Sequence, residues 1–111
     1  MQILQNIPLA SHSPLRFGGA AAYAVEVHNR DDVNEAVNWA RQAKVPVMII
    51  GDGTNIVWRD TGFAGLVLIN KIMGYEPFSE DSENYYVTVG AGENWDSVVA
   101  RSVEAGASGI E

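Results

Sequence analysis

The sequence predicts an α+β fold, in which a β-α-β unit is followed by further strands and a closing helix. Residues 20–27 alternate in polarity as a half-buried strand does, and residues 30–43 repeat apolar side chains at helical spacing. Residues 47–50 are a short, continuous apolar run, which is typical of a buried strand. With 111 residues, of which 47% are hydrophobic, the chain has room for one domain or part of one.

The first segment carries a weaker pattern than those that follow. Residues 1–16 are expected to form an irregular or briefly helical lead-in, because Pro8 and Pro14 interrupt them. Gly18-Gly19 then precedes the strand that is predicted over residues 20–27.

The helix over residues 30–43 has its own start and stop signals. Asn29 is a good N-cap, since Asp32 follows three residues later and acidic residues occupy the first turn. Pro46 ends the helix, and the strand at residues 47–50 completes the β-α-β unit. The apolar face of the helix is expected to contain Val33, Ala36, Val37, Ala40 and Ala43.

The second half of the chain predicts two more strands and a helix. Residues 65–70 indicate a buried strand, residues 76–84 are polar and acidic enough for an exposed hairpin connection, and residues 85–89 indicate a further strand. A second glycine turn follows at residues 90–94. The closing helix should present one face made of Trp95, Val98, Val99, Ser102 and Val103, and Gly106 should end it.

Composition excludes several classes of function. The formal net charge is -7 and no block of basic residues interrupts it, so nucleic acids and anionic membranes are poor partners. There is no cysteine, which removes disulfides and thiolate chemistry. The N-terminus lacks the pattern of a signal peptide, and no run reaches the ~18 apolar residues of a membrane span. A cytoplasmic location is therefore expected.

The sequence predicts no catalytic residue and no metal site. His12 and His28 lack metal-ligand spacing, and surface or capping roles suit them better. No Gly-x-Ser-x-Gly turn carries a nucleophilic serine. Three tryptophans could stack on an aromatic ligand, but packing against the helices explains Trp39 and Trp95 more simply.

The most informative motif is Gly51-Asp52-Gly53-Thr54-Asn55, which follows the apolar run 47–50 without a spacer. The two glycines leave backbone N–H groups bare, and the threonine and asparagine add side-chain donors. A turn of this kind suits a phosphate or pyrophosphate. It also lies at the carboxyl end of a predicted strand, where open α/β sheets usually bind ligands.

The spacing of this turn excludes the commonest phosphate-binding loops. A Rossmann fingerprint requires a third glycine at position 56, where this chain has Ile56, and a Walker loop requires a lysine that is absent. The motif alone is therefore also compatible with a tight structural turn that joins two elements.

Three segments together resemble a known family. The runs Leu15–Gly19, Ile49–Val57 and Val89–Trp95 occur in an order and spacing similar to those of UDP-N-acetylenolpyruvoylglucosamine reductase. That enzyme, also called UDP-N-acetylmuramate dehydrogenase, belongs to the vanillyl-alcohol-oxidase-type FAD proteins. The resemblance covers nearly the whole chain, and Gly-Ala-Gly-Glu-Asn-Trp is its most specific part.

The resemblance implies that residues 1–111 are the first part of a PCMH-type FAD-binding domain that is incomplete here, with the substrate domain absent. It also implies that the FAD pyrophosphate lies on the first glycine turn, mainly against its backbone. The cofactor-binding residues carried over on this basis are Ile50, Gly51, Asp52, Gly53, Thr54, Asn55 and Ile56.

The family's function follows from the same resemblance. In those bacterial, cytosolic enzymes NADPH reduces bound FAD, and the flavin delivers hydride to the enolpyruvyl group of a UDP-N-acetylglucosamine derivative. The product, UDP-N-acetylmuramate, is a peptidoglycan precursor. Because the family's catalytic residues lie beyond position 111, we expect this chain alone to be inactive and to bind FAD weakly.

Two alternatives remain open. The chain could derive from another FAD oxidoreductase of the same superfamily, although the Glu93-Asn94-Trp95 extension of the second turn argues against it. It could also be a non-catalytic FAD-binding or interaction module that a partner chain completes. Self-association through an uncovered apolar patch is a further expectation.

Overall fold

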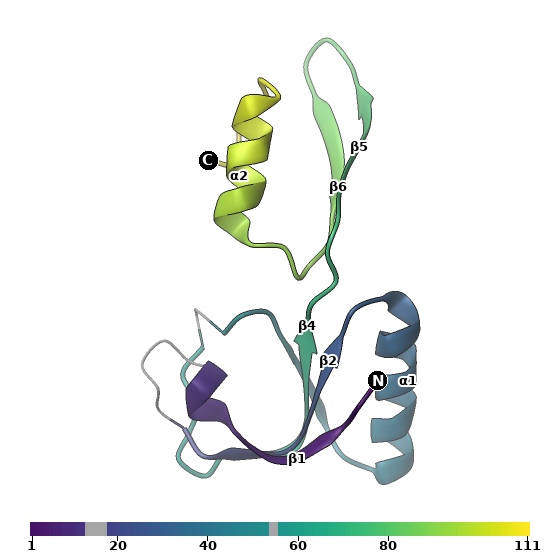
Figure 1. Cartoon of the computed structure of the whole chain (residues 1–111), viewed down its shortest axis with the longest axis vertical. Helices are drawn as coiled ribbons and strands as arrows, with labels where there is room; N and C mark the ends of the chain where they lie inside the picture. Colours follow the sequence, from purple (N-terminus) through teal and green to yellow (C-terminus); the bar gives the residue numbers. More distant parts are fainter. Residues whose placement is uncertain (13–17, 54–55) are drawn as a thin grey trace. The chain divides into compact units, whose positions relative to one another are not determined.

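The computed structural model describes residues 1–12, 18–53 and 56–111. The chain divides into two compact units, Met1–Lys71 and Ile72–Glu111. Figure 1 shows the elements of each.

The first unit is built on a four-stranded mixed sheet with the strand order β1-β2-β4-β3. Strand β1 pairs with β2 in antiparallel orientation, whereas the β2–β4 and β3–β4 pairs are parallel. The elements are β1 (Leu4–Pro8), a 3-10 helix (Leu9–His12), β2 (Ala20–Val27), α1 (Arg30–Ala43), β3 (Val47–Ile50) and β4 (Phe63–Asn70).

The predicted β-α-β unit is confirmed, and β4 lies between its two strands. Leu68 of β4 pairs with Val25 of β2 on one side and with Ile49 of β3 on the other. Helix α1 therefore connects β2 to β3, which are not adjacent in the sheet. The later strand β4 occupies the position between them. As a result the carboxyl ends of three parallel strands, at Val27, Asn70 and Ile50, meet at one edge of the sheet.

Successive side chains of a strand point to opposite faces of a sheet. In this sheet, apolar side chains are buried on both faces. In Figure 1, α1 lies on one side of the sheet and the 3-10 helix lies on the other. The cluster under α1 contains Val25, Val27, Ala36, Ala40, Leu66 and Leu68. The cluster on the opposite face contains Leu9, Ala21, Ala24, Ile50, Trp58, Val67 and Ile69.

Helix α1 begins and ends at the predicted signals. The side-chain oxygen of Asn29 accepts a hydrogen bond from the N–H of Asp32 at 2.8 Å, which satisfies a first-turn donor. Lys44 caps the other end with a left-handed φ of 57°, and Pro46 follows two residues later.

The second unit is a hairpin and one helix. Strands β5 (Tyr75–Glu80) and β6 (Tyr85–Val89) pair in antiparallel orientation, and α2 spans Trp95–Glu104. Asp81 closes the hairpin turn by accepting the N–H groups of Glu83 and Asn84 at 2.8 and 2.7 Å. These backbone hydrogen bonds lower the pKa of the Asp81 carboxyl.

Helix α2 contacts the hairpin through a small polar and aromatic cluster. The hydroxyls of Tyr75 and Ser102 lie 3.3 Å apart, and the guanidinium of Arg101 lies 4.3 Å from the centre of the Tyr75 ring. The predicted stop at Gly106 is confirmed, because this residue takes a φ of +79° one position after the helix cap.

Several sequence-based expectations differ from the structure. The expected buried strand at residues 47–50 is β3, in which Met48 and Ile49 are 38% and 60% exposed, and Ala43, expected on the apolar face of α1, is exposed. The predicted irregular lead-in contains strand β1, whose hydrogen-bond partner β2 lies much later in the chain. The predicted hairpin connection at residues 76–84 is mostly strand β5, and the connection itself is only residues 81–84. Trp95 and Val103, which were expected on the packed face of α2, are 60% and 58% exposed.

Within residues 1–12, 18–53 and 56–111, no helix combines the length and the apolar character that a membrane crossing requires.

Candidate functional site: a glycine turn at the carboxyl edge of the sheet

The first glycine turn begins where β3 ends. Ile50, the last residue of β3, is 2% exposed, and Gly51 and Asp52 immediately after it are exposed. The turn therefore follows the buried last residue of the edge strand β3 and is exposed at the edge where three parallel strands terminate. Thr54 and Asn55, two of the predicted cofactor-binding residues, lie outside the described residues.

The two glycines of this turn meet different requirements. Gly53 is buried and takes a φ of +83°, a conformation that side chains with a Cβ rarely adopt. Gly51 has no positive φ, and a Cβ placed on it would have no atom within 4 Å. Gly53 is thus required by the backbone itself, whereas Gly51 is exposed and has open space beside it.

The turn is anchored at both ends in one apolar cluster. Ile50 belongs to the cluster on the face opposite α1, and the half-buried Ile56 packs against the same cluster. The N–H of Ile56 also donates to the carbonyl of Gly53 at 3.3 Å. The residues on either side of the turn therefore pack in the same core cluster.

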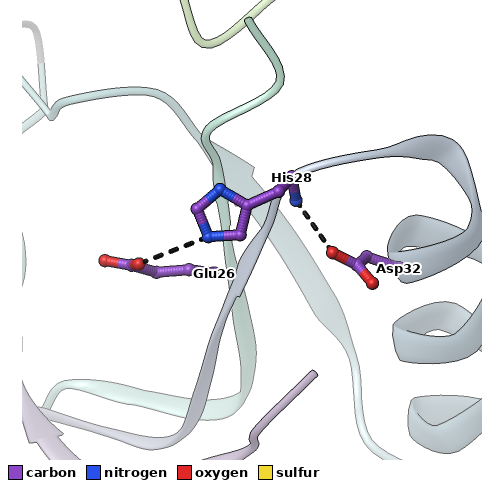
Figure 2. Close-up of polar contacts among 3 residues, drawn as sticks. All are labelled: Glu26, His28 and Asp32. Atoms are coloured by element: carbon purple, nitrogen blue, oxygen red, sulfur yellow. Dashed lines mark hydrogen bonds and ion pairs between the residues drawn. The ribbon is translucent and has the colours of Figure 1, made fainter.

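The start of α1 lies at the same edge, but it does not form a competing anion site. One of its first-turn donors, the N–H of Asp32, is taken by the side chain of Asn29, and the first turn carries Asp31 and Asp32. Figure 2 shows Asp32 reaching back to accept the backbone N–H of His28 at 3.0 Å. A helix start that is capped and acidic repels phosphate, so the glycine turn is the better anion site at this edge.

Residues 58–62, which follow the turn, pack closely against Gly18-Gly19. The N–H of Gly19 donates to the carbonyl of Arg59 at 2.9 Å. A Cβ on Gly18 would lie 2.4 Å from Cβ of Trp58, and one on Gly19 would lie 2.2 Å from the carbonyl oxygen of Asp60. These two glycines therefore let the chain after the turn approach the start of β2.

The second glycine turn has a structural role that sequence reasoning did not identify. The N–H of Gly90 donates to Gly74 at 2.8 Å, and a Cβ on Gly90 would lie 2.3 Å from the carbonyl oxygen of Ile72. The carboxylate of Glu93 accepts the N–H of Gly74 at 2.8 Å, and Asn94 caps α2. The sequence did contain a signal for this role, because Gly90, Glu93 and the N-cap residue Asn94 come just before α2.

The described part of the chain holds no group of three or more His, Cys, Asp or Glu side chains that could bind a metal ion. The described residues of the turn supply backbone, the apolar anchors Ile50 and Ile56, and the exposed Asp52.

Comparison with known proteins identifies the family to which this fold belongs. Residues 21–110, most of both units, match the FAD binding domain family. The chain belongs to this family. The match supports a PCMH-type FAD-binding fold for the mixed sheet and helices described above, as the resemblance implied.

Curated relatives of this FAD binding domain are named UDP-N-acetylenolpyruvoylglucosamine reductase. The protein from Ralstonia nicotianae is 41% identical over 110 residues, which cover 96% of this chain and 32% of the relative. The protein from Thermobifida fusca is 36% identical over 107 residues, covering 96% and 30%. The protein from Burkholderia lata is 33% identical over 112 residues, covering 100% and 32%. The chain thus spans about a third of the length of these relatives.

The turn fits the diphosphate of the cofactor for which this family is named. Open space above Gly51 and the fixed, positive-φ backbone at Gly53 allow a phosphate to approach main-chain N–H groups directly. The side chain of Asp52 is exposed, which is compatible with backbone contact at this position.

Proposed function

We propose that this chain is the FAD-binding portion of an NADPH-dependent reductase that converts UDP-N-acetylglucosamine enolpyruvate to UDP-N-acetylmuramate. Membership of the FAD binding domain family and the names of the curated relatives support this proposal. Such a reaction belongs to peptidoglycan precursor synthesis in the cytoplasm.

The observation that carries the proposal is the geometry of the glycine turn. Residues Ile50–Ile56 form the pyrophosphate site in this proposal, with Gly51 and Gly53 presenting backbone N–H groups to the phosphates. Ile50 and Ile56 hold the ends of the turn in the core, so their contribution is to position the backbone. Thr54 and Asn55 would add side-chain donors.

FAD, when bound, supplies hydride transfer between the nicotinamide and the enolpyruvyl double bond. The residues of this chain bind and orient the diphosphate through the turn. Among the described residues of the turn, Asp52 carries the ionisable side chain. We therefore propose that the chain alone does not turn over the enolpyruvyl substrate, and that its FAD affinity is weaker than that of a full-length relative.

The position of Gly51 makes a clean test of the phosphate site. We expect Gly51→Leu to fold normally, because Gly51 is exposed and a Cβ there would have no described atom within 4 Å, and to weaken FAD binding by at least about tenfold because the side chain occupies the proposed ligand space. Titration of FAD into the purified chain, followed by quenching of flavin fluorescence, measures this. Wild-type affinity is expected to be micromolar, about -8 kcal/mol.

Ala43→Leu is the matched control, since it adds the same side chain to an exposed position at the end of α1. It should bind FAD as the wild type does, and circular dichroism should show all three proteins folded. Equal FAD affinity of Gly51→Leu and the wild type would show that the turn is only structural. Failure of the folded wild type to bind FAD would contradict the proposed function itself.

A second candidate is a non-catalytic FAD-binding module that another chain completes. The exposed edge strand β3 favours it, because Met48 and Ile49 are 38% and 60% exposed and such strands pair with other chains. NADPH consumption in the presence of the enolpyruvyl substrate separates the two candidates. Activity that is gained when the rest of a full-length relative is supplied supports the reductase, and FAD binding without any such gain supports the module.

The remaining alternative, another FAD oxidoreductase of the superfamily, is disfavoured by the relatives that match across the chain. All three described above carry the name of the same reductase.

A further inference from the structure

Strand β3 has β4 as its one neighbour in the described sheet. The N–H of Leu66 in β4 donates to the carbonyl of Pro46 at 2.9 Å, and Leu66 is the register partner of Val47. In a parallel ladder this pattern directs the backbone groups of Pro46 and Met48 toward β4. The N–H and C=O groups of Val47 and Ile49 therefore point to the free edge.

The side chains along this edge are apolar and accessible. Met48 and Ile49 are exposed, and β3 carries no charge. A hollow of about 320 Å³ lies beside Met48, and Ile56, Trp58 and Phe63 also line it. Because these three residues belong to or pack against the cluster opposite α1, the hollow lies on that face of the sheet.

The charges nearest to β3 in the sequence lie symmetrically about its centre. Lys44 is four residues before Met48, Asp52 is four residues after it, and both are exposed. The two ends of the edge thus carry opposite charges, with an uncharged strand between them. A strand with this pattern complements a copy of itself when the copy runs in the opposite direction.

We propose that a second copy of this chain pairs with β3 in antiparallel orientation, about a two-fold axis at Met48, to form a homodimer. Val47 of each copy then lies opposite Ile49 of the other, so that the edge-facing backbone groups of both residues are paired. The same axis brings Lys44 of each copy toward Asp52 of the other. Because a two-fold contact uses the same surface on both partners, each of these pairs occurs twice.

Other arrangements of the two strands satisfy fewer groups. Moving the axis from Met48 to Ile49 would pair Ile49 with itself, set Val47 opposite the glycine turn and carry Lys44 past Asp52. A parallel pairing in register would set Lys44 beside Lys44 and Asp52 beside Asp52, and like charges on neighbouring strands are destabilising.

The pairing also removes apolar surface from water. Met48 lies on the same face as Ile50, opposite α1, so Met48 of the second copy would lie next to the hollow on that face. A flexible thioether side chain suits such an irregular space. On the other face, Ile49 would contact Val47 of the second copy. Since the paired strands are short, we expect a weak dimer that forms as the concentration rises.

A single introduced cysteine reports on the two-fold axis, because the chain itself contains no cysteine. Opposite residues of a non-hydrogen-bonded antiparallel pair have Cα atoms ~4.5 Å apart, within the range of a disulfide. We expect Met48→Cys to form a disulfide-linked dimer at least about tenfold faster than Val57→Cys, which places the thiol at an exposed position outside any strand. Oxidation by glutathione disulfide, followed by non-reducing electrophoresis, measures both rates.

Ile49→Cys is the matched control within β3, since Ile49 faces Val47 of the second copy and not itself. It should cross-link as slowly as Val57→Cys. Circular dichroism should show all three variants folded like the wild type.

Charge reversal provides a second measurement. Lys44→Glu and Asp52→Lys should each weaken the dimer about threefold or more in sedimentation equilibrium, because like charges then meet at both ends of the edge. The double variant should recover the wild-type Kd. Arg30→Glu combined with Asp52→Lys is its control, because it has the same net charge but leaves Lys44 facing a lysine. This control should stay weak.

Faster cross-linking at Met48 than at both control positions, together with recovery in the double charge reversal, would support the homodimer. Equal rates at the three positions, fastest cross-linking at Ile49, or a double variant as weak as the single ones would overturn it. Absence of cross-linking at Met48 in a chain extended to the length of the relatives would assign the edge to the added segments and would also overturn it. None of these measurements involves FAD, so they are independent of the proposed function.

Discussion

Trp58 combines burial with an unmet hydrogen-bonding requirement. Its side chain is 7% exposed, and its indole N–H has no hydrogen-bond partner within the part of the chain that the structure describes. A buried donor without an acceptor costs about 1–3 kcal/mol. The ring nevertheless packs in the core cluster that also contains Ile50. Gly18 leaves room for it, because a Cβ on Gly18 would lie 2.4 Å from Cβ of Trp58.

We expect Trp58→Phe to leave the free energy of unfolding unchanged or to raise it, because it removes the unpaired N–H and keeps most of the apolar ring. Trp58→Ala should lower the free energy of unfolding by about 3–5 kcal/mol, since it leaves a cavity. Urea denaturation measures both. A loss in Trp58→Phe as large as that in Trp58→Ala would mean that the N–H does have a partner.

Within the second unit, one hydrogen bond joins Glu93, which precedes α2, to Gly74, which precedes β5. Its carboxylate accepts the N–H of Gly74, a residue with a φ of +145°, and the contact is partly buried. We expect Glu93→Ala to lower the free energy of unfolding by about 1.5–3 kcal/mol and Glu93→Gln, which keeps an acceptor oxygen, to cost less. Thermal or urea unfolding followed by circular dichroism compares them. Equal losses would exclude this hydrogen bond as the cause.

Strand β3 leads into the glycine turn and is also an edge strand of the described sheet. It has no charged residue between Val47 and Ile50 that would protect this edge. Met48 and Ile49 are 38% and 60% exposed. Exposed, apolar edge strands pair readily with other chains, and natural proteins usually protect them with charges.

We therefore expect the isolated chain to self-associate as its concentration rises, and Ile49→Lys to reduce this association with little change in stability. Sedimentation velocity over a concentration series measures the effect. Val57→Lys is a suitable control, because Val57 is 64% exposed but lies outside any strand. Equal suppression by both variants would indicate a general charge effect and not pairing along β3.

The elements that the sequence predicted well are those whose signals are local. Strand β2, helix α1 and strand β3 have the expected bounds, because polarity patterns, the Asn29 cap and Pro46 all act within a few residues. Strands β1 and β5 were not predicted. β1 is defined by distant pairing with β2, and β5 contains Pro77, beside which the register shifts.

For the candidate site, too, the sequence predicted the local features and not those that depend on the folded backbone. The sequence located the glycine turn at the end of β3, because the motif is contiguous with the apolar strand. It did not distinguish Gly51 from Gly53, since φ and open space are properties of the folded backbone. It also gave no indication that β4 lies between β2 and β3, because this pairing joins segments that are distant in the sequence.

Over the whole molecule, buried side chains are unevenly distributed. In the described part of Met1–Lys71, both faces of the sheet are covered by apolar clusters. In Ile72–Glu111, the buried side chains are Val98 and Ser102. A hairpin and helix with so little buried area have limited stability of their own.

We expect native-state hydrogen exchange to show this difference directly. Amides of β2 and β4 should exchange only with global unfolding, whereas those of β5, β6 and α2 should exchange through openings of lower free energy. Exchange measured by mass spectrometry at several urea concentrations separates the two regimes. Uniform protection along the chain would contradict the expectation and indicate one cooperative unit.

The positions of the three tryptophans determine what optical experiments can detect. Trp39, packed edge-to-face on Tyr23, and the buried Trp58 both report on the first unit. Trp95 is the tryptophan of the second unit, and as an indole already 60% exposed its emission should change little on unfolding. A melt followed by tryptophan emission would therefore be silent about β5, β6 and α2. It would resemble a single transition even if that unit had already opened, and only a backbone signal such as far-ultraviolet dichroism would reveal the earlier step.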